Sequence, residues 1–163
     1  TLDGRLRAFA KATEQAGRAT PELAFSSGAG AAGGLGYALL AYLNANLHSG
    51  IDIMLDIAGF DAAIKDADLV ITGEGKSDEQ TLMGKVPYGV LKRCRKANIP
   101  VWLLSGMIDD ATGRLAESFD LVRSINEGDN RPLSVLMQPD VAKQNLKERV
   151  SFLVANYHEL SMN

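Results

Sequence analysis

Residues 67–75 have the sequence ADLVITGEG, and this stretch decides the fold. Leu69–Thr72 is a short run of largely apolar and β-branched residues, as in a strand that is buried on both faces. Gly73 and Gly75 follow the run directly and are expected to turn the chain. Because strands buried on both faces are typical of parallel sheets, the stretch predicts a parallel sheet with a glycine-bearing turn at a strand end.

Strands and helices alternate downstream of this stretch. A helix is predicted over 87–97, and strands are predicted at PVWLLSG (100–106) and FDLVRSI (119–125). A last helix presents one apolar face, formed by Leu146, Val150, Leu153 and Tyr157. The alternation, with short connections, predicts an α/β fold with helices on both faces of a parallel sheet. Such sheets bind ligands at the carboxyl ends of their strands, where we expect the turns at Gly73–Gly75 and Ser105-Gly106.

The N-terminal third shows helical and glycine-rich patterns. Residues 2–16 predict an amphipathic helix, and residues 19–27 predict a loop. The glycine-rich stretch that begins at Gly28 becomes a helix from Ala31 onward. In residues 51–55 the apolar side chains alternate with Asp and Met, which predicts a short strand.

The composition limits the partners. The net charge of −3 argues against a broad nucleic-acid face or an anionic membrane as a partner. The basic run at 92–96 is interpreted as a solvated helix face near a helix C-terminus. No apolar run approaches the ~18–20 residues of a membrane span. The single cysteine, Cys94, excludes an intrachain disulfide and indicates a reducing compartment.

The glycine-rich stretch fits the pattern G-x-G-x-x-G at Gly28, Gly30 and Gly33, with Gly34 next to it. A dinucleotide site would need a strand before this pattern and a helix after it. The helix is credible, but the preceding TPELAFSS is short and contains proline. Two other interpretations stay open: the glycines let a helix pack closely on another backbone, or they contact a phosphate or substrate.

The segment after the buried strand, GEGKSDEQTLMGK (73–85), carries the groups that phosphate chemistry uses. Gly73 and Gly75 permit close backbone approach and positive φ, and their N–H groups could form an anion-binding nest. Glu74 is an oxygen ligand of the kind that Mg²⁺ prefers. The alternative is an ordinary solvated loop between a strand and a helix. It is not a Walker A loop, which would need glycine at position 79.

Charged residues further along the same segment support the phosphate interpretation. Lys76 and Lys85 could neutralise a phosphate. Asp78 could bind a metal ion, or accept the proton of an attacking hydroxyl group. Asp109 and Asp110 closely follow the strand at 100–106, so they could line the same mouth.

Four stretches together resemble the bacterial glycerate kinases of the first type. They are SGAGAAGGLGYALLAYL (27–43), SGIDIMLD (49–56), ADLVITGEGKSDEQTLMGK (67–85) and P-x-GV (87–90). Their order and spacing match as well, and the resemblance is clear over about residues 20–110. It implies ATP-dependent phosphorylation of D-glycerate with Mg²⁺ in the cytoplasm, with no nucleic acid and no membrane as partner.

The resemblance also implies a domain arrangement. Such kinases have a Rossmann-like domain assembled from both ends of the chain, and a second, glycine-rich α/β domain inserted between them. Residues 1–57 would be the C-terminal part of the inserted domain, and residues 58–163 the C-terminal half of the Rossmann-like domain. The cleft between the two domains would hold D-glycerate and ATP.

The site residues implied by the resemblance fall into three groups. Asp78, Lys76 and Lys85 would be catalytic, and Glu74 and Asp78 would bind the metal. Substrate or phosphate would be bound by Gly28, Gly30, Gly33, Gly34, Gly73, Gly75, Thr81 and Gly84.

Two departures from the family pattern shape the expectations for this chain. The family usually has Arg at the position of Lys76, which keeps the charge but loses the bidentate geometry. Family members are longer and contain an upstream Ser-Phe-Lys segment without a counterpart here. We therefore expect a C-terminal portion that is inactive alone, with an exposed sheet edge that allows self-association. The alternative is a non-catalytic, truncated domain that binds nucleotide or a sugar acid, or that self-associates.

Overall fold

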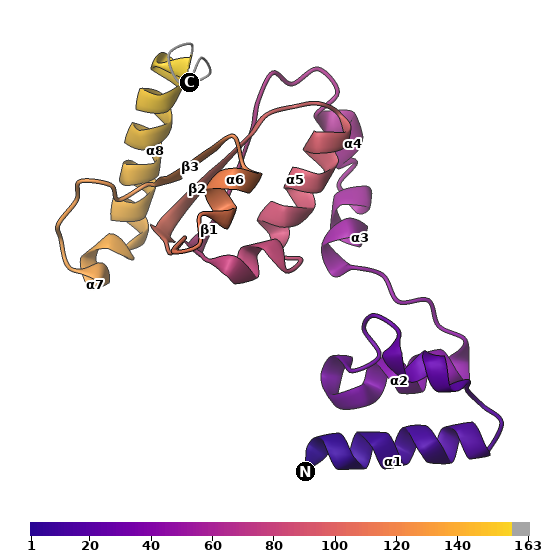
Figure 1. Cartoon of the computed structure of the whole chain (residues 1–163). Helices are drawn as coiled ribbons and strands as arrows, with labels where there is room; N and C mark the ends of the chain where they lie inside the picture. The colour runs from indigo at the N-terminus through magenta and orange to yellow at the C-terminus, as the bar shows by residue number, and fades with distance from the viewer. Residues whose placement is uncertain (158–163) are drawn as a thin grey trace. The chain divides into compact units, whose positions relative to one another are not determined.

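The computed structural model describes residues 1–157, which form two compact units. The first unit comprises Thr1–Ser49, and the second begins at Gly50 (Figure 1). The domain boundary expected at residues 57 and 58 of a longer protein stays a prediction.

Two helices and a short 3₁₀ helix make up the first unit. They are α1 (Leu2–Gln15), η1 (Pro21–Phe25) and α2 (Ala31–Leu43). The hydroxyl of Thr1 accepts a hydrogen bond from the Gly4 N–H and so caps the first helix. Phe9 packs edge-on against Tyr37, with ring centroids 5.7 Å apart. Both predicted helices are confirmed, and the predicted loop at 19–27 contains the 3₁₀ helix.

The second unit contains a three-stranded parallel sheet. Its strands are β1 (Val70–Ser77), β2 (Val101–Ile108) and β3 (Leu121–Ser124), in the order β1-β2-β3. Each strand pairs in parallel with its neighbour in chain order. The predicted α/β class with a parallel sheet is confirmed.

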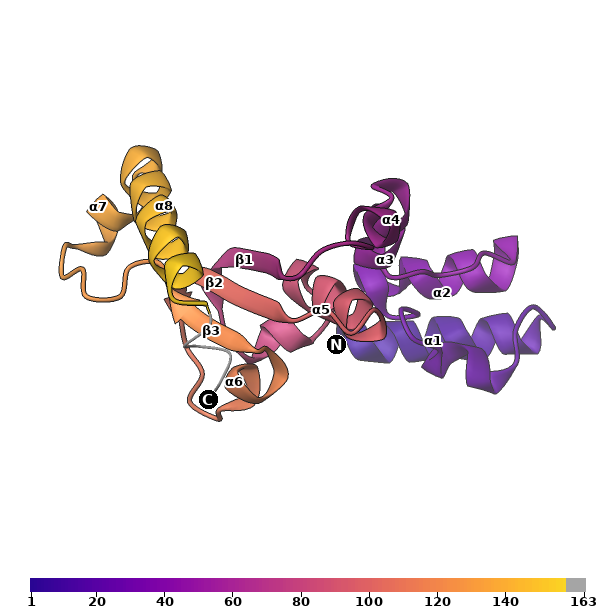
Figure 2. The same cartoon turned by 90° about the horizontal axis from the view of Figure 1, so that it is seen from above.

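Helices cover both faces of this sheet. One face carries α5 (Val86–Lys96) and α6 (Arg114–Ser118), with α3 (Gly50–Ile57) and α4 (Phe60–Ala63) beside α5, and α8 (Pro139–Ala155) covers the opposite face (Figures 1 and 2). Side chains alternate along a strand, so β2 serves two cores. Val101 and Leu103 lie in the core under α5, whereas Trp102 and Leu104 pack with Leu153 of α8. Two short elements complete the unit: η2 (Glu79–Leu82) and α7 (Leu133–Leu136).

The strand predicted at 51–55 is wrong, because these residues belong to helix α3. Ile51 and Leu55 are four residues apart, so they share one helical face and pack into the core beside α5. Ile53 is exposed instead. Gly89 of α5 makes this packing close, since a Cβ there would lie 2.4 Å from Ile51 Cγ1. A run of five residues fits the period of a strand as well as that of a helix, and packing against α5 favours the helix.

The turns predicted at Gly73–Gly75 and Ser105-Gly106 are also wrong, because both pairs lie inside strands. Neither Gly73 nor Gly75 has a positive φ. The close backbone approach predicted for Gly73 is found: a Cβ there would lie 1.9 Å from the Leu104 carbonyl oxygen. A Cβ at Gly106 would lie 2.7 Å from the Gly75 carbonyl oxygen. These glycines let two backbones approach each other, and β1 continues through them to Ser77.

The close approach predicts a difference between two glycines of one strand. Gly73→Ala should lower the free energy of unfolding by about 1–3 kcal/mol, because the new methyl group has no room beside Leu104. Gly75→Ala is the matched control, since its Cβ would meet nothing within 4 Å. Thermal and urea unfolding of both variants would measure this difference. Equal destabilisation would contradict the packing role of Gly73.

Candidate functional site

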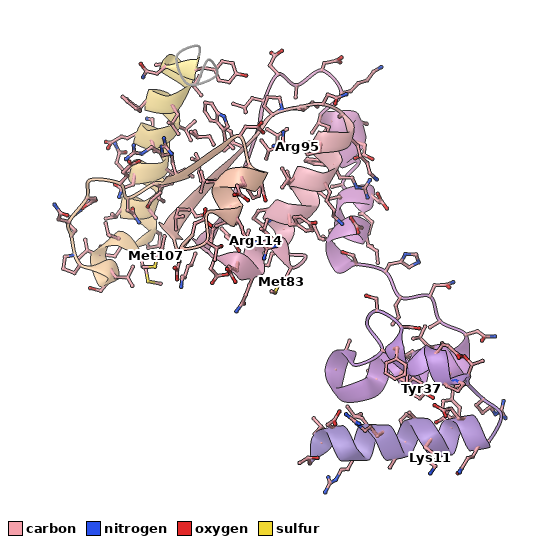
Figure 3. The ribbon with its side chains drawn as sticks, viewed as in Figure 1. Lys11, Tyr37, Met83, Arg95, Met107 and Arg114 are labelled. Carbon is pink, nitrogen blue, oxygen red and sulfur yellow. The ribbon has the colours of Figure 1, made fainter. Side chains whose placement is uncertain are left out.

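Alternating charges lie where β1 and β2 end. Lys76 Nζ is 3.0 Å from Asp109 Oδ2 and 4.0 Å from Asp78 Oδ2. Lys85 Nζ is 3.6 Å from Asp78 Oδ1 and also 3.6 Å from Glu74 Oε2. We call these five side chains the ion-pair chain; they come from β1, from the loop after β2 and from the segment between β1 and α5. Met83 and Met107 mark this end of the sheet in Figure 3.

Glu74 is the most enclosed carboxylate of the ion-pair chain. Its side chain is only 19% exposed. Oε1 accepts hydrogen bonds from Thr81 Oγ1 at 2.5 Å and from Ser77 Oγ at 3.1 Å. The other oxygen, Oε2, faces Lys85. Hydrogen bonds thus fix one oxygen of Glu74, and the other oxygen faces the Lys85 ammonium group.

Asp78 begins the short helix η2 and is fixed there by backbone contacts. Its Oδ1 accepts from the Gln80 N–H at 3.0 Å. Its own N–H donates to Thr81 Oγ1 at 3.1 Å. A carboxylate at a helix start satisfies N–H groups that have no partner within the helix. The cap holds the Asp78 carboxylate close to Lys85.

The two lysines of the ion-pair chain remain accessible. The side chain of Lys76 is about half exposed, and that of Lys85 is 37% exposed. The hydrogen bond to Asp109 raises the pKa of Lys76 above its ordinary value. Exposed ion pairs of this kind contribute little to stability, and a stronger anion can replace one partner.

Gly84 and Thr81 help to position residues of the ion-pair chain. Gly84 has a φ of +98°, a conformation that glycine adopts without strain, and the chain turns there just before Lys85. Thr81 is fully buried, and its hydroxyl contacts Glu74 and the Asp78 backbone. The structure therefore brings Thr81 to the Glu74 carboxylate and the Asp78 backbone rather than to the surface.

An open hollow of about 680 Å³ lies beside the ion-pair chain. Its lining residues are Asp78, Glu79, Gln80, Met83, Lys85, Asp109 and Ala111. Ligand pockets of roughly 300–1,000 Å³ are common in proteins, so the hollow has room for a phosphate-bearing molecule.

The two aspartates after β2 have different surroundings. Asp109 lines the hollow, as expected, and binds Lys76. Asp110 accepts hydrogen bonds from the N–H groups of Leu115 and Ala116, at 3.0 Å and 2.9 Å. Asp110 thus caps helix α6 and does not line the hollow.

The glycine-rich segment lies in the first unit. Gly28, Gly33 and Gly34 have positive φ, as does Ala32. Within residues 1–157 no strand precedes this segment; the 3₁₀ helix η1 does. A Cβ at Gly36 would lie 2.1 Å from the Gly28 carbonyl oxygen. The geometry favours close backbone packing and lacks the strand that a dinucleotide site needs.

A metal ion would find few protein ligands here. Within residues 1–157, no group of three or more His, Cys, Asp or Glu side chains could hold a metal ion. Glu74 and Asp78 nevertheless present one oxygen each to the same Lys85 ammonium group. Mg²⁺ is usually bound by one or two carboxylates together with water and substrate phosphates. The pair therefore fits an ion that arrives with a phosphate.

Sequence reasoning missed Ser77 and Ser105, which lie buried behind Glu74. Their hydroxyl oxygens are 2.6 Å apart. The parallel register that pairs Glu74 with Ser105 could have indicated them, but only if β1 had been extended through Gly73 and Gly75. Within the described part of the chain, no helix is long and apolar enough to cross a membrane.

The two aspartates give a stability prediction. Asp110→Asn should lower the free energy of unfolding by about 1 kcal/mol, because α6 loses a charged cap. Asp109→Asn is the neighbouring control and should change it by less than about 0.5 kcal/mol, because its ion pair is exposed. Urea unfolding would measure both. A larger loss in Asp109→Asn than in Asp110→Asn would contradict these assignments.

Comparisons with known proteins match the motifs of the sequence. The model of the glycerate kinase family matches residues 1–157. Glycerate kinase of Bacillus subtilis (strain 168) is 44% identical over 128 residues, which are 78% of this chain and 33% of the relative. Glycerate 2-kinase of Escherichia coli (strain K12) is 48% identical over 86 residues, which are 53% of this chain and 23% of the relative.

A solved structure from Salmonella typhimurium LT2, assigned as glycerate kinase 2, aligns with 72% of this chain and 27% of its own. The identity is 37% and the TM-score 0.47. The chain spans no more than about a third of the length of these curated relatives. The resemblance found in the sequence is confirmed, and the chain belongs to the glycerate kinase family.

Proposed function

We propose that the protein containing this chain transfers a phosphoryl group from ATP to D-glycerate with Mg²⁺, and that this chain supplies the phosphate-handling part of the site. Family membership and the names of the relatives support the reaction. The observation that carries the assignment is the ion-pair chain, where two lysines and three carboxylates meet at the carboxyl ends of two parallel strands.

Phosphoryl transfer suits such a constellation because it asks the protein mainly for positioning and charge stabilisation. In our proposal Lys76 and Lys85 contact phosphate oxygens during the reaction. Each lysine already has carboxylate partners, and phosphate oxygens would replace them. Both lysines are cationic donors on accessible side chains, which supports this exchange.

The carboxylates receive different roles. Glu74 and Asp78 would hold Mg²⁺ together with the phosphates, and the ion would neutralise charge on the phosphates. Asp78 would also accept the proton of the attacking glycerate hydroxyl. Its oxygens border the hollow, and its cap geometry fixes the carboxylate, which supports this role.

The glycines and Thr81 are assigned to the shape of the site. We propose that Gly73, Gly75 and Gly84 set the backbone path past the phosphates, and that Thr81 orders the loop between them. Gly28, Gly30, Gly33 and Gly34 would shape a substrate pocket in the other domain. Four positive-φ positions from Gly28 to Gly34 give that segment an unusual backbone, which supports a specialised role.

We infer the setting of the reaction from the resemblance to the family. We propose that residues 1–57 belong to the inserted glycine-rich domain and residues 58–163 to the Rossmann-like domain. We propose a cytoplasmic location, which the free, buried Cys94 supports.

Self-association through a sheet edge is the second candidate. β1 pairs only with β2 in residues 1–157, so its outer edge has no strand partner in the described chain. An open edge can pair with a second copy. Size-exclusion chromatography of the 163-residue chain would test it: dimers would support edge pairing, and monomers at high concentration would contradict it.

Replacing Asp78 tests the reaction. In the full-length protein, Asp78→Asn should lower kcat by about 10²–10⁴-fold, because a base and metal ligand is lost. The thermal midpoint should change little. ADP release with Mg-ATP, with and without D-glycerate, is the measurement. The control is Asp61→Asn, an exposed partner of Arg93 that is remote from the hollow. Normal turnover in Asp78→Asn would end the assignment.

Lys85 gives an independent test. Lys85→Met should lower kcat/KM for ATP by about 10-fold or more, because a charge-assisted contact to phosphate is lost. Lys92→Met is the control, since Lys92 lies on the same region of the chain but pairs with Asp52 of α3. Steady-state kinetics at varied ATP would compare the two. Equal, small changes of kcat/KM for ATP in Lys85→Met and Lys92→Met would contradict a phosphate contact of Lys85.

A further inference from the structure

We propose that Ser105, Ser77 and Thr81 are positioning residues that hold Glu74 by one oxygen, so that Glu74 acts through Oε2 alone. This inference rests on the proposed function, since it gives the metal-binding carboxylate of that site its orientation. The three hydroxyls are fully or almost fully buried, and they come from β1, β2 and η2. We call this group the hydroxyl relay.

The distances define a continuous set of contacts. Ser105 Oγ lies 2.6 Å from Ser77 Oγ, and Ser77 Oγ lies 3.1 Å from Glu74 Oε1. On the other side, Thr81 Oγ1 lies 2.5 Å from the same Glu74 oxygen and accepts the N–H of Asp78. Ser77 and Thr81 therefore both bind Oε1, and Ser105 acts on it through Ser77.

The direction of each hydrogen bond follows from counting protons. An ionised carboxylate only accepts, and each hydroxyl has a single proton to donate. Ser77 donates its proton to Glu74, so the short contact between the serines must be donated by Ser105. Thr81 likewise donates to Glu74 and accepts from the Asp78 backbone. Each proton of the relay has one place to go, and the relay has one orientation.

Burial makes this orientation costly to break. A buried hydroxyl that loses its hydrogen-bond partner is destabilised, so each member depends on the others. No buried side-chain nitrogen or oxygen of residues 1–157 lacks a partner. Removing Ser105 would leave Ser77 without its donor and free it to turn from Glu74. The effect would reach the carboxylate although Ser105 does not touch it.

The two carboxylate oxygens of Glu74 therefore have different roles. Oε1 already carries two hydroxyl donors, whereas Oε2 has Lys85 at 3.6 Å. A cation or a phosphate-bound metal can therefore reach Glu74 only through Oε2. Thr81 also ties the Asp78 backbone to Glu74, so the same hydroxyl fixes the spacing of both carboxylates.

A metal-binding titration tests the relay. The full-length protein would be titrated with Mn²⁺ in the presence of ADP, and bound Mn²⁺ followed by electron paramagnetic resonance. Ser105→Ala should weaken Mn²⁺ binding by about two- to ten-fold, the loss expected for one hydrogen bond. It should lower kcat to a similar extent and leave the KM for D-glycerate unchanged. Glu74→Gln gives the upper limit of the effect.

The control is Ser124→Ala on strand β3. Ser124 pairs in register with Ser105, and its hydroxyl bonds the Gly106 carbonyl oxygen without contact to Glu74. This variant should stay within two-fold of the wild type in Mn²⁺ binding. Thr81→Val should weaken binding like Ser105→Ala or more, and Thr81→Ser, which keeps the hydroxyl, should restore most of the loss. If Thr81→Val does not fold, the Mn²⁺ affinities of Ser105→Ala and Thr81→Ser still test the relay.

Several results would overturn the relay. One is Ser105→Ala binding Mn²⁺ as tightly as Ser124→Ala. Another is Thr81→Ser losing as much as Thr81→Val, which would indicate packing by the methyl group. A third is Glu74→Gln leaving Mn²⁺ affinity unchanged. If the wild type binds Mn²⁺ through Glu74 but does not phosphorylate D-glycerate, the proposed reaction fails while the relay is still judged on the Mn²⁺ titration.

Discussion

The close pairing of β1 with β2 is the constraint on which the candidate site depends. Gly73 allows β1 to approach the Leu104 carbonyl oxygen, and Gly106 allows β2 to approach Gly75. The resulting register sets Glu74 beside Ser105. Because both strands are parallel, they end at the same edge of the sheet, and Asp78 and Asp109 leave them there. A larger residue at either glycine would disturb the register and every charged contact that follows from it.

The candidate site combines a rigid back with an accessible front. Behind Glu74, buried hydroxyl groups fix one carboxylate oxygen. In front, Lys76 and Lys85 hold their carboxylate partners at partly exposed positions, where ion pairs are weak and screened. A ligand with phosphate charge would meet lysines that can exchange partners, on a backbone that need not move. Such preorganisation is what phosphoryl transfer asks of a protein.

The sequence predicts the fold class well and selects charged residues that the structure brings together, but it predicts local geometry less well. The apolar runs Leu69–Thr72 and Val101–Leu104 identify two neighbouring strands correctly. Val101–Leu104 is buried on both faces, whereas Ile71 of β1 is 38% exposed, so the burial predicted for the first run is wrong within the described residues. The run at 51–55 misleads because Ile51 and Leu55 fit a helix as well as a strand, and packing on α5 selects the helix. Glycine usually marks a turn, but the close approach predicted at Gly73 occurs inside a strand, where the backbone of β2 leaves no room for a Cβ.

The charged residues of the ion-pair chain could be selected from sequence as candidates, because Lys and Asp near glycines favour an interpretation as phosphate chemistry. Ser77 and Ser105 could not, because serine is common and their contact joins two strands 28 residues apart.

The roles proposed for the ion-pair chain can be tested most directly by a crystal structure of the full-length protein with Mg²⁺ and ADP. We expect the phosphates within hydrogen-bonding distance of Lys85 and the ion on Glu74 Oε2 or Asp78. Phosphates bound elsewhere, with Lys76 and Lys85 still paired to their carboxylates, would contradict the account.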